Sequence, residues 1–561
     1  MPSQRILGLN RTQDASLCLV EDGRVSVHVQ KERLTRRKHA WGRPGDVGRV
    51  YRTRVPEIAA PVDMVVECFS SDPQRAKLDE YRRELEEELT FREAPRILEV
   101  SHHLAHAYGA FHPSPFDEAA VMVVDFQGSP GGLVTETWPG PVVGEATSVE
   151  VASYYLGQAS SSPSLRCLGK SFWSKARTSH GGLGYFYWAL TQCLFPGAGR
   201  EGIVMGLAPY GDPSALDLPA LEVAKGGVTM PAAWIDVFRF PDRFRFFKDG
   251  RGSFRDCADL AAAGQKVFEE ALIETARWLR RESGARNLVY TGGCALNCSA
   301  NERLRREAGY EAVFLPPAPH DGGTAVGCAL YGWFEVSGGR ERWRWREDYL
   351  GPQPDFAQTV ESLRSSPEVE VGEPADLAEV AAAALARGEI VALFQGRSES
   401  GPRALGHRSI LADPRYAAVT AFINREIKER QWFRPLAPIV LAEAQGEYFA
   451  LDVASPFMQL AAPVRPESRA TIPAVTHVDE TARLQTVAAD GDPLLRAVLE
   501  AFAGRTGVPV LLNTSLNGRD EPIVETADEA VGLFLRRPIH HLAMPPFWIS
   551  KLGSTPHPLR C

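Results

Sequence analysis

The stretch ILGLNRTQDASLCLVEDGRVSVHV, residues 6–29, decides the expected fold. It begins with a short apolar run and continues through a polar loop that contains Asp14. Apolar alternations then flank the pair Asp22-Gly23, and Asp-Gly in that setting is a strong signal for a β-hairpin. The stretch therefore predicts a strand, a loop that bears an aspartate, and an antiparallel hairpin.

A similar pattern recurs further along the chain. An apolar run at residues 119–124 leads directly into Asp125, and a glycine-rich turn around Gly128 precedes a second expected strand at residues 133–137. A strand, an aspartate and a hairpin that occur twice are typical of a duplicated nucleotide-binding core. Strand–turn–strand patterns are also common in unrelated folds, so the two hairpins alone leave the duplication open.

Helices and strands alternate through the rest of the sequence, which predicts an α/β fold. We expect a long helix over residues 258–281, a strand at 288–290 and a helix of small residues at 322–331. Further on, an apolar strand at residues 390–394 leads into a glycine-bearing loop, residues 396–405, which we expect to enter a helix.

Length and composition indicate how the chain is organised. A chain of 561 residues exceeds what one hydrophobic core usually serves, and the best linker candidate is the Trp- and Arg-rich segment 340–348. We therefore predict two domains, residues 1–350 and residues 351–561. The sequence has no run of about 18 apolar residues and no signal-peptide core, which predicts a cytoplasmic protein without a membrane partner.

The sharpest local signal is SHHLAH, which begins at Ser101. If Ser101 caps a helix, His102 and His106 lie four residues apart on one face. Two imidazoles at that spacing can share a metal ion. Asp125 and Asp321 each follow an apolar strand and are suitable carboxylates to complete such a site. The competing interpretation is a pair of histidines without a ligand, which is the more frequent one for this spacing alone.

Two further patterns indicate anion binding. Gly292 and Gly293 follow a strand and would let a nucleotide approach the backbone, and Asn297 can hydrogen-bond a ribose or phosphate. In the C-terminal half, cations and neutral donors occur near glycine-rich turns and strand ends: Arg403, Lys428, Arg434, Arg483, Asn513 and Ser515. Arg and Lys bind phosphate oxygens, and Ser and Asn can recognise a carbamoyl head. The plainer interpretations are a glycine turn without chemistry and surface arginines in weak ion pairs.

Together these motifs identify a family resemblance. The chain resembles the O-carbamoyltransferases of natural-product biosynthesis, which modify aminoglycosides, ansamycins and hydroxymethyl-cephems. The resemblance covers nearly the whole chain, and the order of its motifs makes it specific. They are LGLN at 7–10 with DAS at 14–16, KERLTR at 31–36, HHLAH at 102–106, MGLA at 205–208, TGG at 291–293, GPRALG at 401–406, WFRP at 432–435 and LNTS at 512–515.

The resemblance implies a fold and a two-step reaction. The N-terminal domain would be a duplicated actin-like (ASKHA) domain, in the version used by tRNA threonylcarbamoyl transferases, and the C-terminal domain would be YrdC-like. In such enzymes the YrdC-like domain makes carbamoyl-adenylate from carbamoyl phosphate and ATP and releases pyrophosphate. The N-terminal domain then transfers the carbamoyl group to an acceptor hydroxyl. The implied acceptor is a small molecule, such as an antibiotic or another secondary metabolite.

The resemblance also implies roles for particular residues. The metal, Fe(II) or a similar divalent ion, would be held by His102, His106, Asp125 and Asp321. The adenylate would be contacted by Gly292, Gly293 and Asn297. Carbamoyl phosphate and ATP, the latter with Mg²⁺, would be bound by Arg403, Lys428, Arg434, Arg483, Asn513 and Ser515.

Departures from the family pattern bear on the mechanism and the acceptor. Relatives commonly carry His directly before the Asp-Ala-Ser motif, where this chain has Gln13. A side-chain amide cannot take a proton at neutral pH, so Asp14 becomes the nearer base and, with Asp321, an expected catalytic residue. Trp188 diverges from relatives within residues 185–200, which we expect to shape the acceptor pocket, so the acceptor stays open.

Two other functions remain open at this point. A nucleic-acid modifier that carbamoylates or threonylcarbamoylates tRNA or a nucleobase would use the same two domains. The net charge of −8 and the lack of an extended basic run disfavour a nucleic-acid partner. An ASKHA-type metabolite kinase would release ADP rather than AMP, and it would leave the arginine-rich C-terminal domain without a role.

Overall fold

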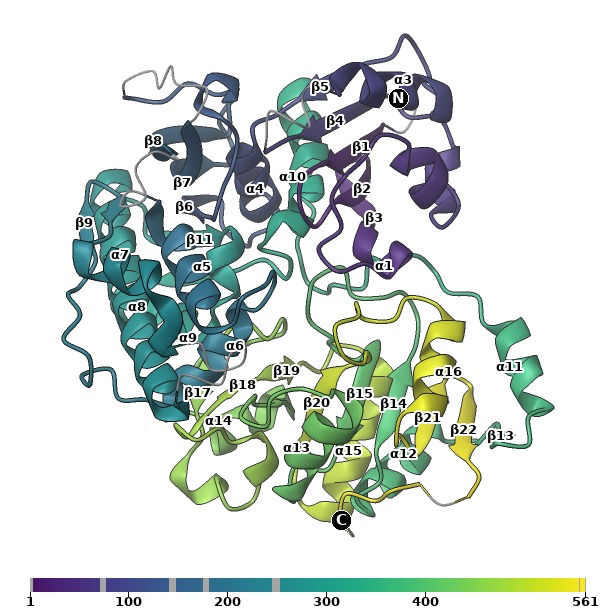
Figure 1. Cartoon of the computed structure of the whole chain (residues 1–561). Coiled ribbons are helices and arrows are strands. Elements are labelled where there is room, and N and C mark those ends of the chain that lie inside the picture. The colour runs from purple at the N-terminus through teal and green to yellow at the C-terminus, as the bar shows by residue number, and fades with distance from the viewer. Residues whose placement is uncertain are drawn as a thin grey trace. The chain divides into compact units, whose positions relative to one another are not determined.

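The computed structural model describes residues 4–70, 77–140, 148–174, 181–244, 253–553 and 555–559. The chain forms two compact units, which comprise residues 1–35 with 39–346 and residues 36–38 with 347–561. Each unit is a mixed α/β structure, as predicted (Figure 1). None of the described helices is both long and apolar enough to cross a membrane. The assignment of one reaction step to residues 1–350 and the other to residues 351–561 stays a prediction.

The first unit contains a five-stranded sheet built on the predicted hairpin. Its order is β3-β2-β1-β4-β5, in which β1, β2 and β3 form an antiparallel meander and β4 and β5 run parallel to β1. Asp22 and Gly23 have φ values of 48° and 82°, the left-handed pair that a two-residue hairpin turn requires. The strands β1 to β5 are Arg5–Asn10, Ser16–Glu21, Arg24–Gln30, Met64–Cys68 and Ile97–Glu99.

A second five-stranded sheet in the same unit repeats this topology. Its order is β12-β11-β6-β7-β8, with β6, β7 and β8 antiparallel and β11 and β12 parallel to β6. The repeat confirms the predicted duplication. The strands β6, β7, β8, β11 and β12 are Glu118–Val124, Ser148–Gln158, Leu165–Ser174, Asn287–Thr291 and Ala312–Phe314.

The predicted partner of β6 is wrong. Residues 134–137 belong to no strand, and β6 pairs instead with β7. The glycine-rich segment forms a 3₁₀ turn at Gly131–Leu133 and no hairpin with β6. The antiparallel partner of β6 comes from further along the sequence.

Helices α4 (His102–Phe111) and α10 (Thr324–Tyr331) pack against each other within the first unit, and α10 also packs on β1, β2 and β4 (Figure 1). A Cβ at Gly327 would overlap the carbonyl oxygen of Ala105, so this close crossing requires glycine. Every second residue of the antiparallel meander is buried in one core: Leu7, Leu9, Leu17, Leu19, Val27 and Val29.

The second unit is built on an eight-stranded mixed sheet of order β13-β22-β21-β14-β15-β20-β16-β19. The glycine-bearing loop after β14 leads into the antiparallel strand β15 and not into the predicted helix. Gly396 and Gly406 have φ values of 40° and 120°, which are not helical. The strands β13 to β16 and β19 to β22 are Val369–Gly372, Val391–Phe394, Arg408–Ala412, Ala437–Leu441, Gln485–Val487, Val510–Ser515, His541–Met544 and Phe547–Lys551.

The remaining helices cover the sheets of both units. The helix expected at residues 258–281 lies within α8, which begins at the capping side chain of Ser253 and ends at Gly284 with φ of 68°. In the first unit the helices are α1 Lys31–Thr35, α3 Leu78–Glu88, α5 Gly182–Leu194, α6 Glu201–Leu207, α7 Ala232–Arg239, α8 Phe254–Ser283 and α9 Cys298–Glu307. In the second they are α11 Ala357–Arg364, α12 Leu377–Ala386, α13 Ala418–Phe422, α14 Gln445–Tyr448, α15 Pro493–Thr506 and α16 Ala527–Arg536.

Candidate functional site

Helix α4 carries the two histidines predicted as metal ligands. It begins directly after Ser101, as predicted, but the Ser101 hydroxyl donates to Glu136 and does not cap the helix. The amide of His102 is satisfied instead by the hydroxyl of Ser129, at 2.9 Å. His102 and His106 are both buried and lie about one turn apart on the same face of α4.

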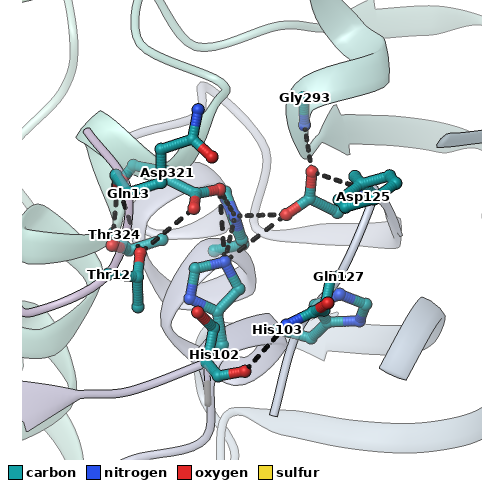
Figure 2. A network of polar contacts seen from close by, with 12 residues as sticks. Thr12, Gln13, His102, His103, Asp125, Gln127, Gly293, Asp321 and Thr324 are labelled. Carbon is teal, nitrogen blue, oxygen red and sulfur yellow. Dashed lines mark hydrogen bonds and ion pairs between the residues drawn. The ribbon is translucent and has the colours of Figure 1, made fainter. Parts of the chain in front are cut away.

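Two carboxylates meet these imidazoles, as Figure 2 shows. The Nε2 atoms of His102 and His106 are 3.2 Å apart. Oδ2 of Asp125 lies 3.4 Å and 3.5 Å from these two nitrogens, and Oδ1 of Asp321 lies 3.3 Å and 3.6 Å from them. The structure therefore brings together all four residues that were expected to hold a metal, with one ligand atom of each within 4.8 Å of the others.

Each carboxylate is oriented by hydrogen bonds to its other oxygen. Asp125 follows β6, and its Oδ1 accepts from the amides of Phe126 at 2.8 Å and Gly293 at 3.1 Å. Asp321 lies just before α10, and its Oδ2 accepts from the hydroxyl of Thr12 at 3.0 Å (Figure 2). Outer partners of this kind fix the direction in which a ligand atom points. They leave the remaining oxygen of each aspartate directed at the imidazoles.

Burial and charge act in opposite directions on these groups. Burial alone would lower the pKa of His102, but Asp321 and Asp125 reverse this and hold that pKa well above its usual value. Burial would likewise raise the pKa of Asp125, but the close imidazoles of His102 and His106 hold it well below its usual range. Asp125 is therefore ionised, which is the form that binds a cation.

The loop predicted to bind a nucleotide follows β11 and lies against this cluster. Gly292 has a φ of 97°, a conformation that favours glycine, and the amide of Gly293 donates to Asp125. Asn297 begins helix α9, because its Oδ1 accepts from the amide of Ala300 at 3.1 Å. The structure thus places the two glycines beside the His–Asp cluster. The side chain of Asn297 caps the N-terminus of α9.

The expected catalytic residue Asp14 lies in the loop between β1 and β2. Its Oδ1 is 2.9 Å from Nδ1 of His39. Burial alone would raise the pKa of Asp14, but the hydrogen bond and charge of His39 lower it. Asn10 links this loop to the His–Asp cluster, because its side-chain amide donates to the carbonyl oxygens of Asp14 at 3.1 Å and Asp321 at 2.9 Å.

His39 is a residue that the sequence reasoning missed. Its imidazole follows a basic run that directly continues the KERLTR motif. A histidine next to a family motif was the signal available in the sequence. Its pairing with Asp14 depends on a contact between two loops and could not be read from spacing.

In the second unit, Lys428 is buried against the end of β20. Its Nζ donates to the carbonyl oxygen of Ser515 and to the side chain of Asn517 at 2.8 Å. Burial lowers the pKa of Lys428 well below its usual value, and the charges of Arg430 and Arg434 add to that effect. The structure therefore brings Lys428, Ser515 and nearby arginines together.

Three arginines of this unit repel one another. Burial and the charges of Arg434 and Arg483 hold the pKa of Arg430 well below its usual value. Burial and the charge of Arg483 lower the pKa of Arg434 to about 10. Guanidinium groups at such a site are stabilised by an anion that binds between them. Arg430 is a cation of this group that the predicted binding set did not include.

Asn513 and Arg403 belong to neighbouring segments of the same unit. Nδ2 of Asn513 donates to the carbonyl oxygen of Ala404 at 2.8 Å and to the side chain of Gln485 at 3.2 Å. This contact joins β20 to the glycine-bearing loop that carries Arg403. Oδ1 of Asn513 is buried and accepts no hydrogen bond from the part of the chain that the structure describes, so a ligand N–H would satisfy it.

Comparisons with known proteins cover both units. The family model described as carbamoyltransferase N-terminus matches residues 47–330, and that described as carbamoyltransferase C-terminus matches residues 382–551. The chain is 34% identical to nodulation protein NolNO of Sinorhizobium fredii, over 97% of this chain and 80% of that protein. It is 31% identical to the 3'-hydroxymethylcephem-O-carbamoyltransferase of Amycolatopsis lactamdurans, over 65% of this chain and 69% of that protein. The structure of T. kodakarensis HypF aligns with a TM-score of 0.35 and 14% identity, over 60% of this chain and 48% of that one.

Proposed function

The chain belongs to the carbamoyltransferase family, and from this premise we propose that it transfers a carbamoyl group, in an ATP-dependent reaction, to a hydroxyl of a small-molecule acceptor such as an antibiotic or another secondary metabolite. One observation carries the proposal beyond the family assignment. The two units hold centres of opposite character, a His–Asp cluster in the first and a cluster of cations in the second. Two such centres suit a reaction with separate activation and transfer steps.

The activation step is assigned to the second unit, which would be YrdC-like in fold. Carbamoyl phosphate, ATP and one water molecule would react there to form carbamoyl-adenylate, with release of phosphate and pyrophosphate. Both substrates are polyanions, so their approach needs cations, with Mg²⁺ on the ATP. The residues that would supply this charge and the neutral donors are Arg403, Lys428, Arg430, Arg434, Arg483, Asn513 and Ser515.

The His–Asp cluster fits a divalent metal ion of the Fe(II) type. Two imidazoles and two carboxylates form a donor set that such ions accept. Oδ2 of Asp125 is buried and accepts no hydrogen bond from the described residues, and a cation held with His102, His106 and Asp321 would satisfy it. When bound, the ion would supply Lewis-acid chemistry toward an adenylate phosphate or the carbamoyl carbonyl.

The first unit would bind the adenylate and present it to the acceptor. The adenylate would contact the backbone at Gly292 and Gly293, next to Asp125 and the rest of the His–Asp cluster. The side chain of Asn10 joins Asp14 to Asp321 of the same cluster, because it donates hydrogen bonds to the backbone carbonyl oxygens of both residues. A water-poor site in this unit would protect the reactive mixed anhydride from hydrolysis.

The products test the proposal. The enzyme would be incubated with ATP, carbamoyl phosphate and candidate hydroxyl acceptors, and the nucleotides and acceptors would be analysed by chromatography and mass spectrometry. We expect AMP and pyrophosphate from ATP, and an acceptor heavier by one carbamoyl unit. ADP with a phosphorylated acceptor would identify a kinase, and carbamoylation without ATP would refute the adenylate route.

A variant of the His–Asp cluster separates the two steps. His106→Ala should lose bound metal and acceptor carbamoylation but still release pyrophosphate, because the cations of the second unit are unchanged. The control is His112→Gln, at the end of the same helix, where the ring contacts Ser164 at 2.9 Å and belongs to no metal cluster of the described residues. Equal metal content in His106→Ala and in the wild type would show that His106 is not a ligand.

A further inference from the structure

One loop of the first unit is tied closely to the turn between β1 and β2. The amide of Ala15 donates to the carbonyl oxygen of Ala40 at 2.9 Å. A Cβ at Gly42 would lie 2.6 Å from the Cα of Arg11, so glycine is required for this close approach. These contacts hold His39, which directly precedes Ala40, at a fixed place beside the β1–β2 turn.

His39 and Asp14 form a carboxylate–imidazole pair at this place. Nδ1 of His39 lies 2.9 Å from Oδ1 of Asp14, and the backbone amide of His39 donates to Glu32 at 3.0 Å. Both members of the pair have a left-handed backbone, with φ of 53° at His39 and 51° at Asp14. Non-glycine residues keep this conformation only where their surroundings enforce it, and such residues gather at functional sites.

The opposite edge of the imidazole faces the segment expected to shape the acceptor pocket. A Cβ at Gly199 would overlap Nε2 of His39, and Gly199 belongs to residues 185–200. Gly199 has a φ of 68°, so both its backbone and its neighbour favour glycine. The His39 side chain is 33% exposed and that of Asp14 12% exposed, so small molecules can reach the ring while the carboxylate lies deeper.

We propose that His39, held by Asp14, accepts the proton of the acceptor hydroxyl during carbamoyl transfer. This inference rests on the proposed function and names a residue for its second step. The hydroxyl oxygen would form a bond to the carbamoyl carbon with its own electron pair, while Nε2 of His39 takes the hydroxyl proton. The bond between the carbamoyl carbon and the phosphate oxygen breaks, AMP leaves with that electron pair, and His39 then releases the proton to water.

Asp14 is a positioning residue in this assignment and not the base. Because its carboxylate accepts from Nδ1–H of His39, it favours the tautomer whose Nε2 can take a proton. Burial alone would raise the pKa of Asp14, but the hydrogen bond and charge of His39 lower it, so Asp14 stays an anion. Among the described residues, titratable groups that face the pair include Glu32, Glu201, His320 and Asp125.

The test measures single-turnover transfer from preformed carbamoyl-adenylate, and pyrophosphate release is measured separately on the same enzymes. His39→Gln should lower the transfer rate on the order of 10²- to 10⁴-fold and leave pyrophosphate release and bound metal unchanged. The wild-type transfer rate should fall as the pH falls, because a protonated imidazole cannot act as a base, and His39→Gln should lose that dependence. The matched control His557→Gln, in the second unit, should transfer at the wild-type rate.

Two further measurements keep a structural effect apart from a chemical one. Free imidazole should restore part of the transfer rate of His39→Ala if the ring acts as a base, and a misfolded variant would not respond. Asp14→Asn should slow transfer but keep a fall in rate at low pH, since the base is still present. If Asp14→Asn transfers the carbamoyl group at the wild-type rate, Asp14 does not position His39.

Other outcomes would overturn the assignment of His39 itself. Wild-type transfer by His39→Gln would show that another group takes the proton. Loss of bound metal from His39→Gln would instead place His39, with Asp14 and Glu32, at a metal ion. A wild-type enzyme that releases no pyrophosphate from ATP and carbamoyl phosphate would refute the proposed function, and transfer from the preformed adenylate would still report on His39.

Discussion

The substitution Gly327→Ala adds one methyl group at the crossing of α4 and α10. A Cβ at this position would overlap the carbonyl oxygen of Ala105, which lies on α4 between His102 and His106. To reach ordinary van der Waals contact, the helices would have to separate by on the order of 1 Å, because protein interiors are close-packed. Asp321 lies just before α10, so this separation would draw its carboxylate away from the two imidazoles.

Two magnitudes follow from that displacement. Overpacking costs about 1–3 kcal/mol, which lowers the Tm of the first unit by roughly 2–6 °C. A functional site tolerates displacements of only about 0.5 Å, so the affinity of Gly327→Ala for Fe(II) should fall about 10- to 100-fold. Calorimetry measures the first effect, and metal analysis after dialysis at buffered free Fe(II) concentrations measures the second.

The same substitution at an open position is the control. Gly504 lies within α15, and nothing lies within 4 Å of a Cβ added there. Gly504→Ala should therefore stabilise its helix by up to about 1 kcal/mol and leave Fe(II) binding unchanged. A Gly327→Ala protein with the wild-type Tm and full Fe(II) affinity would refute the reasoning, because the site would then not depend on how closely α4 and α10 approach.

Other substitutions test other parts of the chain. Burial lowers the pKa of His28 from 6.5 to about 4, so its effect on stability is absent above pH 6.5 and grows as the pH falls toward 4. The free energy of unfolding of the wild type should drop by about 2 kcal/mol between pH 7.5 and pH 5. In His28→Gln, Tm measurements over the same pH range should show no such loss of stability. An identical pH dependence in the variant and the wild type would contradict the burial argument. The side chain of Asp376 caps α12 by accepting from the amide of Glu379 at 2.9 Å. Asp376→Ala should therefore lower the free energy of unfolding of the second unit by about 1 kcal/mol, measured by urea unfolding. An unchanged free energy would show that water replaces the cap. Arg434→Ala should lower pyrophosphate release at least about tenfold, whereas Arg496→Ala should not, and equal rates would remove Arg434 from the activation site.

Local signals made part of the fold predictable. The hairpin at Asp22-Gly23 formed where the two-residue turn chemistry placed it, and the repeated strand–aspartate pattern corresponded to a true repeat of the sheet topology. The partner of β6 was not predictable. Residues 133–137 resemble a strand in sequence, although the glycines that precede them form a 3₁₀ turn. The strand after β14 was not predictable for a similar reason. The φ value of Gly396 excludes a helix there, and this value cannot be inferred from the sequence.

The site was predictable where ligand type and position within an element were enough. His102 and His106 share a helix face by their spacing alone, and Asp125 follows a strand that the sequence shows clearly. His39 was not predictable, because its meeting with Asp14 depends on a close approach of two loops that Gly42 permits. Contacts between loops that are distant in sequence are set by tertiary packing, which periodicity and turn signals do not report.

The repeated strand order of the first unit also allows its two halves to be compared. Strands β1 and β6 hold the same position in their sheets, and each leads into a loop with an aspartate, Asp14 in one and Asp125 in the other. In this chain one carboxylate meets the single imidazole of His39 and the other meets the paired imidazoles of α4. The loop after the first strand of each sheet therefore carries an acid that meets imidazole, but the number of imidazole partners differs between the two halves.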